Sequence, residues 1–288
     1  MVIRIGYDLQ FQILAPVAMV AMLHVHPSRS QDLLDSGGVG IDPAVPVEQY
    51  LDGFGNLCSR FRAPQGSLRL HNSTFIQDSG EPDAVNREAR QIPVEQLPPE
   101  TLQFLMNSRY CEVDRLSPLA VQLFGDTQPG WPRVQAICDW VHEKVTFGYQ
   151  FARSTKSALD VHSECTGVCR DFQHLAITFC RCMNIPARYA TGYLGDIRVP
   201  PVPAPMDFSA WFEVYLDGRW WTFDARHNTP RVGRVLMAVG RDASDVAITT
   251  SFGLAPLTGF NVTSDEVFGV SGDASARMDP RQSSPQAL

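Results

Sequence analysis

The clearest pattern of apolar and polar positions lies at the start of the chain. There, every second residue is apolar: Ile3, Ile5, Tyr7, Leu9 and Phe11. Alternation with a period of two predicts a strand with one buried face. Residues 17–25 and 68–75 are further strand candidates, and turn sequences such as Asp52-Gly53 lie between them. We therefore expect residues 1–90 to form a β-rich domain resembling a small sandwich.

The next part of the chain has helical and connecting patterns. Residues 79–100 are polar and contain four prolines, which is typical of a connection. Short helix candidates at 102–106 and 116–124 make residues 91–130 an expected helical connection. Pro132 can begin another helix. The apolar face of that helix consists of Val134, Ile137, Trp140, Val141 and Val145.

The strongest helical pattern follows Gly167, where a sharp turn is expected. Its apolar residues are Phe172, Leu175, Ala176, Phe179, Cys180 and Met183. Their spacing predicts one buried helix face. Cys169 then lies at the first turn, where unpaired backbone N–H groups and the helix dipole favour a thiolate. Cys169 is therefore a candidate nucleophile, and the commoner alternative is a buried structural cysteine.

A β-hairpin is predicted downstream of this helix. Residues 209–216 and 219–225 are strand candidates joined by an Asp-Gly turn. A two-residue turn fixes the register, so that Trp211 is expected to face Asp224. Because side chains alternate along a strand, Ser209 and Trp211 are expected to share a face with Asp224.

Charge and cysteine content exclude several classes of function. The chain has 288 residues and a net charge of −7, and no basic patch stands out, so we expect no nucleic-acid partner. The sequence contains no run of 18 apolar residues, so we expect no membrane span. Gln12 and Pro16 interrupt the apolar run at 11–23, which favours a strand over an export signal. Seven scattered cysteines are typical of reduced thiols in a cytoplasmic protein.

Several motifs together resemble one family. They are Gly-Val-Cys-Arg-Asp-Phe-Gln-His-Leu at 167–175, Asn-Ile-Pro-Ala-Arg-Tyr at 184–189, Ala-Trp-Phe-Glu-Val-Tyr at 210–215 and Trp-Trp-Thr-Phe-Asp at 220–224. This combination resembles the transglutaminase-like superfamily, and more closely bacterial transglutaminase-like proteins with an amino-terminal β-domain. The resemblance implies an α+β fold, with a papain-like core over 131–262 in which a helix bearing the cysteine packs on an antiparallel sheet. Residues 263–288 are polar and are expected to form a disordered tail.

The resemblance also implies a catalytic triad. The family places a cysteine at the helix start, a histidine on the first hairpin strand and an aspartate on the second. In this sequence Cys169 is then the nucleophile and Asp224 the acid, but Ser209 stands at the histidine position. A serine has no pKa near neutrality and cannot accept a proton as an imidazole does.

Three hypotheses remain open for this position. In the first, His227 supplies the base if the strand ends near Ala225, and His162 is a weaker candidate. His174, five residues along the helix from Cys169, is expected to point away. In the second, a Cys–Ser–Asp site is completed by water or a ligand. In the third, the protein binds without turnover.

A metal site is the competing interpretation of the cysteines. Cys165, Cys169, Cys180 and Cys182 with His162 or His174 do not match common zinc spacings. We therefore expect neither a metal nor a cofactor.

The expected function is cysteine-based acyl chemistry on a peptide or other amide, either as a peptidase or amidase, or as a transglutaminase-type acyltransferase. Trp211 and Asp171 are the expected substrate contacts, although Trp211 also suits a core wall and Asp171 a local pair with Arg170. The alternative function is a weakly active or inactive binding or scaffold protein. The sequence does not indicate an oligomeric state.

Overall fold

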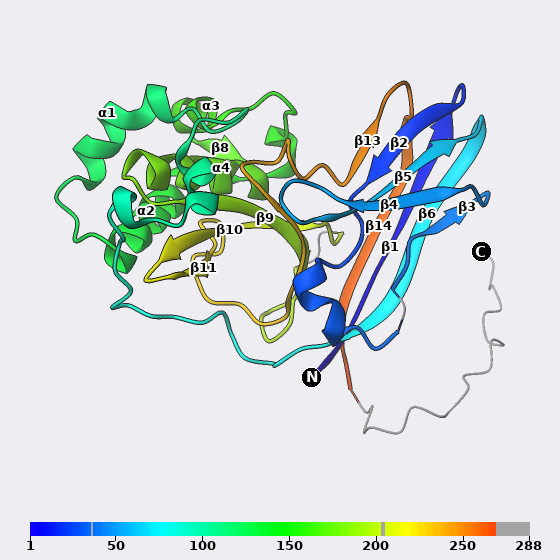
Figure 1. The fold of residues 1–288 in the computed structure, drawn as a ribbon, viewed down its shortest axis with the longest axis horizontal. Helices are drawn as coiled ribbons and strands as arrows, with labels where there is room; N and C mark the ends of the chain where they lie inside the picture. The colour runs from blue at the N-terminus through cyan, green and yellow to red at the C-terminus, as the bar shows by residue number, and fades with distance from the viewer. Residues whose placement is uncertain (36, 203–204, 269–288) are drawn as a thin grey trace.

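The computed structural model describes residues 1–35, 37–202 and 205–268. It contains a β-sandwich and a core in which helices pack on a sheet, and these two parts lie side by side (Figure 1). A sheet-rich first part followed by an α+β core confirms the fold class expected from the sequence.

The sandwich consists of two four-stranded sheets that enclose one apolar cluster. One sheet has the order β14 (Leu257–Val267), β1 (Val2–Ile13), β6 (Gly66–Gln77) and β3 (Gly40–Asp42). The other has the order β13 (Thr249–Ser251), β2 (Val17–Ala21), β5 (Leu57–Ala63) and β4 (Val47–Leu51). The alternation at the start of the chain is confirmed, because the odd-numbered residues of β1 are all buried.

The last two strands correct the expected domain boundaries. β14 pairs with β1 from Val2–Val267 to Phe11–Leu257, and β13 pairs with β2. Residues 249–267 therefore belong to the sandwich, whereas the core was expected to reach residue 262 and the tail to begin at 263. β14 is an edge strand with mostly exposed side chains, so its polar sequence did not reveal it. The rest of the predicted tail, 269–288, lies outside the described residues.

Four α-helices and a third antiparallel sheet form the described part of the core. The helices are α1 (Val113–Phe124), α2 (Trp131–Lys144), α3 (Ala158–Glu164) and α4 (Cys169–Cys182). The sheet has the order β11 (Arg219–Phe223), β10 (Ser209–Leu216), β9 (Ala187–Leu194) and β12 (Arg234–Gly240). Short strands β7 (Thr146–Phe147) and β8 (Thr166–Gly167) pair in parallel. The 3-10 helices are η1 (Pro27–Asp32), η2 (Val94–Gln96), η3 (Pro99–Leu105) and η4 (Tyr149–Phe151).

The helix α4 lies at the centre of the core and is buried on every side. Residues 171–181 are all buried, because α1, α2 and α3 pack around the helix and β9 and β10 cover it (Figure 1). The apolar stripe predicted only one buried face. The polar residues of the other faces are buried with partners: for example, Arg181 donates hydrogen bonds to the backbone oxygens of Met106 and Ala187. Such partners offset the cost of burying polar groups.

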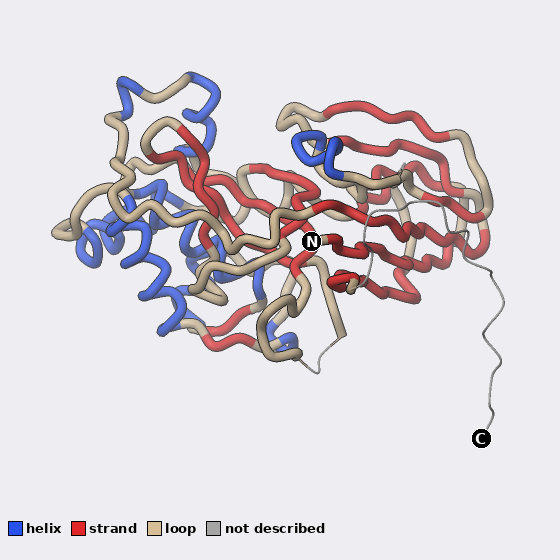
Figure 2. The backbone as a smooth tube through the Cα atoms, turned by 90° about the horizontal axis from the view of Figure 1, so that it is seen from below, coloured by secondary structure: helices blue, strands red, loops and turns tan. Residues whose placement is uncertain are grey.

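The sandwich and the core share apolar side chains. Tyr193 from β9 and Val235 and Met237 from β12 are buried in the same cluster as the inward face of β1. In the view from below, strands of both parts lie where the sandwich and the core meet (Figure 2). The sandwich therefore supports the sheet that carries the candidate site.

Candidate active site

The residue Cys169 begins α4, directly after a tight approach of the chain. A Cβ at Gly167 would lie 2.6 Å from the Asp171 Cβ, so only glycine fits there. The Val168 backbone N–H donates to Asp171 Oδ2 at 3.0 Å, and Arg170 pairs with the same carboxylate. Asp171 is thus buried as the cap of its own helix. It lines neither cavity at Cys169, which differs from the substrate contact expected for it.

The Cys169 thiol is half-buried, and its environment opposes ionisation. The positive charge of Arg226 and the nearby backbone N–H groups of Arg170 and Ala210 act to lower the pKa of the thiol. Burial nevertheless raises the pKa of the Cys169 thiol to about 11, and the Asp207 carboxylate acts in the same direction. The position of Cys169 at the helix start had predicted the opposite, a lowered pKa of the thiol. At neutral pH this site therefore holds a thiol, and a base is needed to remove its proton.

The histidine of a histidine–aspartate pair lines a cavity that also contains Cys169. The His227 Nδ1 lies 2.9 Å from Asp224 Oδ2, and His227 lines the same cavity as Cys169. Asp224 is almost fully buried, with 2% of its side chain exposed, while 24% of the His227 side chain is exposed. The expected substitute base is thus hydrogen-bonded to the expected acid.

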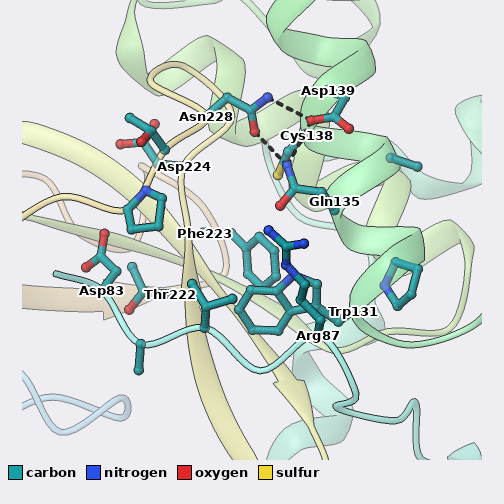
Figure 3. A pocket seen from close by; sticks show the side chains of 16 residues that line it. Asp83, Arg87, Trp131, Gln135, Cys138, Asp139, Thr222, Phe223, Asp224 and Asn228 are labelled. Carbon is teal, nitrogen blue, oxygen red and sulfur yellow. Dashed lines mark hydrogen bonds between the residues drawn. The ribbon is translucent and has the colours of Figure 1, made fainter.

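The local sequence explains why His227 reaches this position. The strand β11 ends at Phe223, so the predicted register holds down to the Phe212–Phe223 pair and Trp211 does not pair with Asp224. A turn follows, in which Asn228 adopts φ +50°. The Asn228 side chain donates to Asp139 Oδ1 at 2.8 Å and accepts from Gln135 Nε2 at 2.9 Å, which ties the turn to α2 (Figure 3).

Buried donors hold Asp224 in its ionised form. Gln173 Nε2 donates to Oδ1 and Arg234 Nη2 to Oδ2, both at 3.0 Å. Asp83, from the connection between sandwich and core, binds Arg234 Nε at 2.9 Å. Hydrogen bonds from His227 and the charge of Arg234 outweigh burial and hold the pKa of Asp224 far below its usual range. A carboxylate can only accept, so His227 Nδ1 donates and its Nε2 is left to accept a proton.

Two cavities meet at Cys169. The smaller, of about 170 Å³, is also lined by Asp207, Ser209, Arg226 and His227. The larger, of about 460 Å³, lies along Val168 and other mainly apolar residues. A still larger cavity of about 590 Å³ lies behind Asp224, between α2 and β11, and does not include Cys169 (Figure 3). The chemistry of the site is therefore confined to the first two.

Comparison with known proteins agrees with this geometry. A family model described as the transglutaminase-like superfamily matches residues 118–225. A solved structure from Cytophaga hutchinsonii, named as a candidate cysteine protease, has 32% sequence identity and a TM-score of 0.79, and the match covers 93% of this chain and 92% of that chain. The chain belongs to the transglutaminase-like superfamily. An uncharacterized Mycobacterium leprae protein is 28% identical over 215 residues, or 71% of this chain and 75% of that protein.

The remaining predicted residues of this transglutaminase-like protein lie in different places. Ser209 lines the smaller cavity at Cys169. Trp211 is buried with the Arg234 guanidinium 5.1 Å over its ring, so it supports the residue that binds Asp224. The His162 ring stacks on Trp140, with 5.9 Å between ring centroids, and lines neither cavity. His162 is therefore not beside the thiol.

The other histidine and cysteines of the metal hypothesis are also separated. His174 stacks on Tyr110 with ring centroids 4.9 Å apart, and burial lowers its pKa to about 3. Cys180 is fully buried in the apolar core, whereas Cys165 is exposed. Within the described residues, no three histidine, cysteine or acidic side chains gather as a metal site.

Sequence reasoning missed three charged residues beside Cys169. Asp207, Arg226 and Arg231 all line the smaller cavity. Asp207 stands two positions before Ser209, and Arg226 lies between the paired Asp224 and His227. Their closeness in the sequence to Ser209, Asp224 and His227 was the signal that could have identified them.

Proposed function

We propose that this protein carries out acyl chemistry on amide bonds, with Cys169 as nucleophile and His227 as the base that replaces an imidazole at position 209. The observation that supports this proposal most directly is the His227–Asp224 hydrogen bond of 2.9 Å in the wall of the cavity that holds Cys169. A base oriented by a carboxylate beside a thiol is the general arrangement of cysteine nucleophiles.

The proposed reaction begins with proton transfer from the Cys169 thiol to His227 Nε2 as the sulfur attacks the amide carbon. The Arg170 and Ala210 N–H groups at the sulfur suit an oxyanion hole for the tetrahedral intermediate. The C–N bond then breaks, and His227 returns the proton to the leaving amine. Water or a second amine takes the acyl group from the thioester, which gives hydrolysis or acyl transfer respectively.

One observation favours a second candidate function. The pKa of about 11 at Cys169 and the serine at position 209 both reduce thiolate formation. A weakly active or inactive protein that uses the same cavities to bind amide ligands would tolerate both features. This candidate predicts no acyl-enzyme.

The proposal also includes the cellular compartment in which the protein works. All seven cysteines are free, which supports a reducing compartment such as the cytoplasm. No helix within the described ranges has the length and apolar content needed to cross a bilayer.

The proposal is tested by trapping the acyl-enzyme. The protein is mixed with p-nitrophenyl acetate at pH 7.5 and followed by nitrophenol release and intact-protein mass spectrometry. We expect one acetyl group per chain, located on Cys169 by peptide mapping, and none in Cys169→Ala. The matched control is Cys182→Ala, because Cys182 is half-buried at the opposite end of α4. Acetylation that is slow and equal across several cysteines would support the binding protein instead.

A further inference from the structure

The two cavities that meet at Cys169 differ in chemistry. The larger is lined mainly by apolar side chains, such as Val168, Tyr189, Phe208, Val246, Ile248 and Phe260. Arg153, Arg170 and Asp207 also line it, and Asp207 lines both cavities. The smaller holds most of the charged groups near the thiol: Asp196, Asp207, Arg226, His227 and Arg231. A substrate bound across the sulfur would therefore place an apolar part on one side and a charged part on the other.

The position of His227 indicates which part of the substrate each cavity holds. In an acyl transfer the base that takes the thiol proton returns it to the departing amine, so the amine must leave on the side of the base. His227 lines only the smaller of the two cavities. On the proposed mechanism, the apolar cavity holds the acyl side of the amide and the smaller cavity holds the leaving amine.

Two guanidinium groups in the smaller cavity have N–H donors that lack an acceptor among the described residues. The Arg226 guanidinium lies 3.8 Å over the Phe147 ring, and the described residues give its side chain no hydrogen bond or ion pair. The Arg231 side chain is only 6% exposed. Its Nη2 donates to the Gly195 oxygen at 3.0 Å, while its buried Nε has no partner in the described structure. Buried donors without an acceptor are costly, and an anionic ligand would satisfy them.

The nearby carboxylates compete only in part. Asp196 lies 4.0 Å from Arg231 Nη2, is partly exposed, and already accepts from the Val202 N–H. Burial raises the pKa of Asp207, which makes its negative charge easier to lose than that of an ordinary aspartate. Neither forms a close ion pair with Arg226. The two arginines are thus the groups in this cavity with unused donors.

We propose that the leaving amine is an amino acid, whose free carboxylate is bound by Arg226 and Arg231 while an apolar acyl residue occupies the larger cavity. This inference rests on the proposed function and specifies its substrate class. A cavity of about 170 Å³ holds roughly five or six waters at about 30 Å³ each, which is enough for one small residue.

The step balances with water as the co-reactant. The Cys169 sulfur bonds to the acyl carbon, the C–N bond breaks, and the thiol proton passes through His227 to the nitrogen of the departing amino acid. Water then cleaves the thioester, which gives the free acid and restores the thiol. No oxidant or reductant is involved.

The test measures binding without turnover. Cys169→Ala protein is titrated by calorimetry with N-acetyl-leucyl-glycine, with its C-terminal amide, and with the amide of N-acetyl-leucyl-aspartate. We expect the free acid to bind at least about tenfold more tightly than the glycine amide, because a charge-assisted pair is lost in the amide. The aspartate amide separates a side-chain carboxylate from a terminal one, and we expect it to bind like the glycine amide.

Arginine variants locate the effect. In the Cys169→Ala background, Arg226→Gln and Arg231→Gln should each remove most of the preference for the free acid. Arg62→Gln is the matched control, since Arg62 is exposed on the sandwich strand β5. Equal binding of acid and amide by the Cys169→Ala protein overturns the inference without any arginine variant, as does a preference for the aspartate amide over the free acid.

Turnover by the wild-type protein is a separate readout. A preference for the free acid in binding, together with no release of glycine by the wild type, would contradict the proposed function but leave the carboxylate site standing. Cleavage of acid and amide at equal rates would retain the function and remove the carboxylate site. The failures of the two proposals are therefore distinguishable.

Discussion

The described residues include two histidine–aspartate pairs with the same separation but different surroundings. In the core, His227 Nδ1 lies 2.9 Å from Asp224, and on the sandwich His71 Nε2 lies 2.9 Å from Asp42. Only 2% of the Asp224 side chain is exposed, against 62% for Asp42. Asp224 is also bound by Arg234 and Gln173, while Asp42 is open to water.

The comparison shows that two pairs with equal distances can differ in their chemistry. An exposed ion pair is weakened by solvent and contributes little, whereas a buried and fully hydrogen-bonded carboxylate fixes both the orientation and the tautomer of its histidine. The two histidines also differ in their neighbours. His227 lines a cavity with the Cys169 thiol, whereas the cavity described at His71 is lined by no cysteine.

The largest expected effect comes from removing each histidine in turn. On the proposed mechanism, His227→Ala should lower the rate of Cys169 acetylation by about 10²- to 10³-fold, which is the usual contribution of a general base. His71→Ala should leave the rate within about twofold of the wild type. Stopped-flow measurement of nitrophenol release checks both, and equal rates in the two variants would remove His227 from the mechanism.

A third histidine sharpens the comparison through its effect on stability. His174 is buried and accepts from the Ala243 N–H. Burial outweighs the nearby Asp242 charge and lowers the pKa of His174 to about 3. As pH falls below about 6.5, the unfolded chain binds a proton that the folded protein does not, so stability falls by about 1.4 kcal/mol per pH unit. Between pH 8 and pH 5 this histidine alone should reduce the free energy of unfolding by about 2 kcal/mol.

Urea unfolding of the wild type and of His174→Gln between pH 5 and pH 8 isolates this contribution. Glutamine retains an acceptor for the Ala243 N–H and does not titrate. As pH falls, the wild type should lose more stability than the variant, because only the wild type has His174. A difference that is constant with pH would contradict the pKa assigned to His174.

The smallest expected effect concerns Ser209. Both Asp224 oxygens are already occupied, Oδ2 by His227 and Arg234 and Oδ1 by Gln173 and backbone N–H groups. Ser209→His alone should therefore change the acetylation rate by less than about threefold. In the His227→Ala background Asp224 Oδ2 is partly freed, and Ser209→His should restore at least about tenfold. Ser209→Gln in the same background is the control for size without a proton acceptor.

A large gain from Ser209→His in the otherwise wild-type protein would contradict this expectation. It would show that His227 is not positioned to act and that the serine is what limits the thiol. The same stopped-flow assay measures the wild type, the two single variants and the two double variants.

Local patterns predicted the elements of the site well. The start of α4 at Cys169 and the hairpin register down to Phe223 followed from spacing and turn chemistry, because these depend on neighbouring residues. The condition set for His227, that the strand must end before it, is met by the turn after Phe223. Its role as a base stays a prediction.

Properties that depend on distant packing were not predictable. The predicted direction of the pKa shift at Cys169 was wrong, because burial by other parts of the chain outweighs the effect of the helix start. Asp171 was assigned to substrate, but the close approach at Gly167 places it inside the helix cap. The unsatisfied donor of Arg231 is visible only once the chain is folded.

The pairing of β14 with β1 has a consequence for how the chain can be divided. Strands that precede and follow the α+β core in the sequence complete one sandwich, so the core is an insertion within that domain and not a module that follows it. A fragment ending at residue 90 would lack two strands and leave the long edge of β1 open to intermolecular pairing. Truncation at a single point therefore separates neither part intact, and a subdomain would have to be obtained by excising the insertion and rejoining the ends.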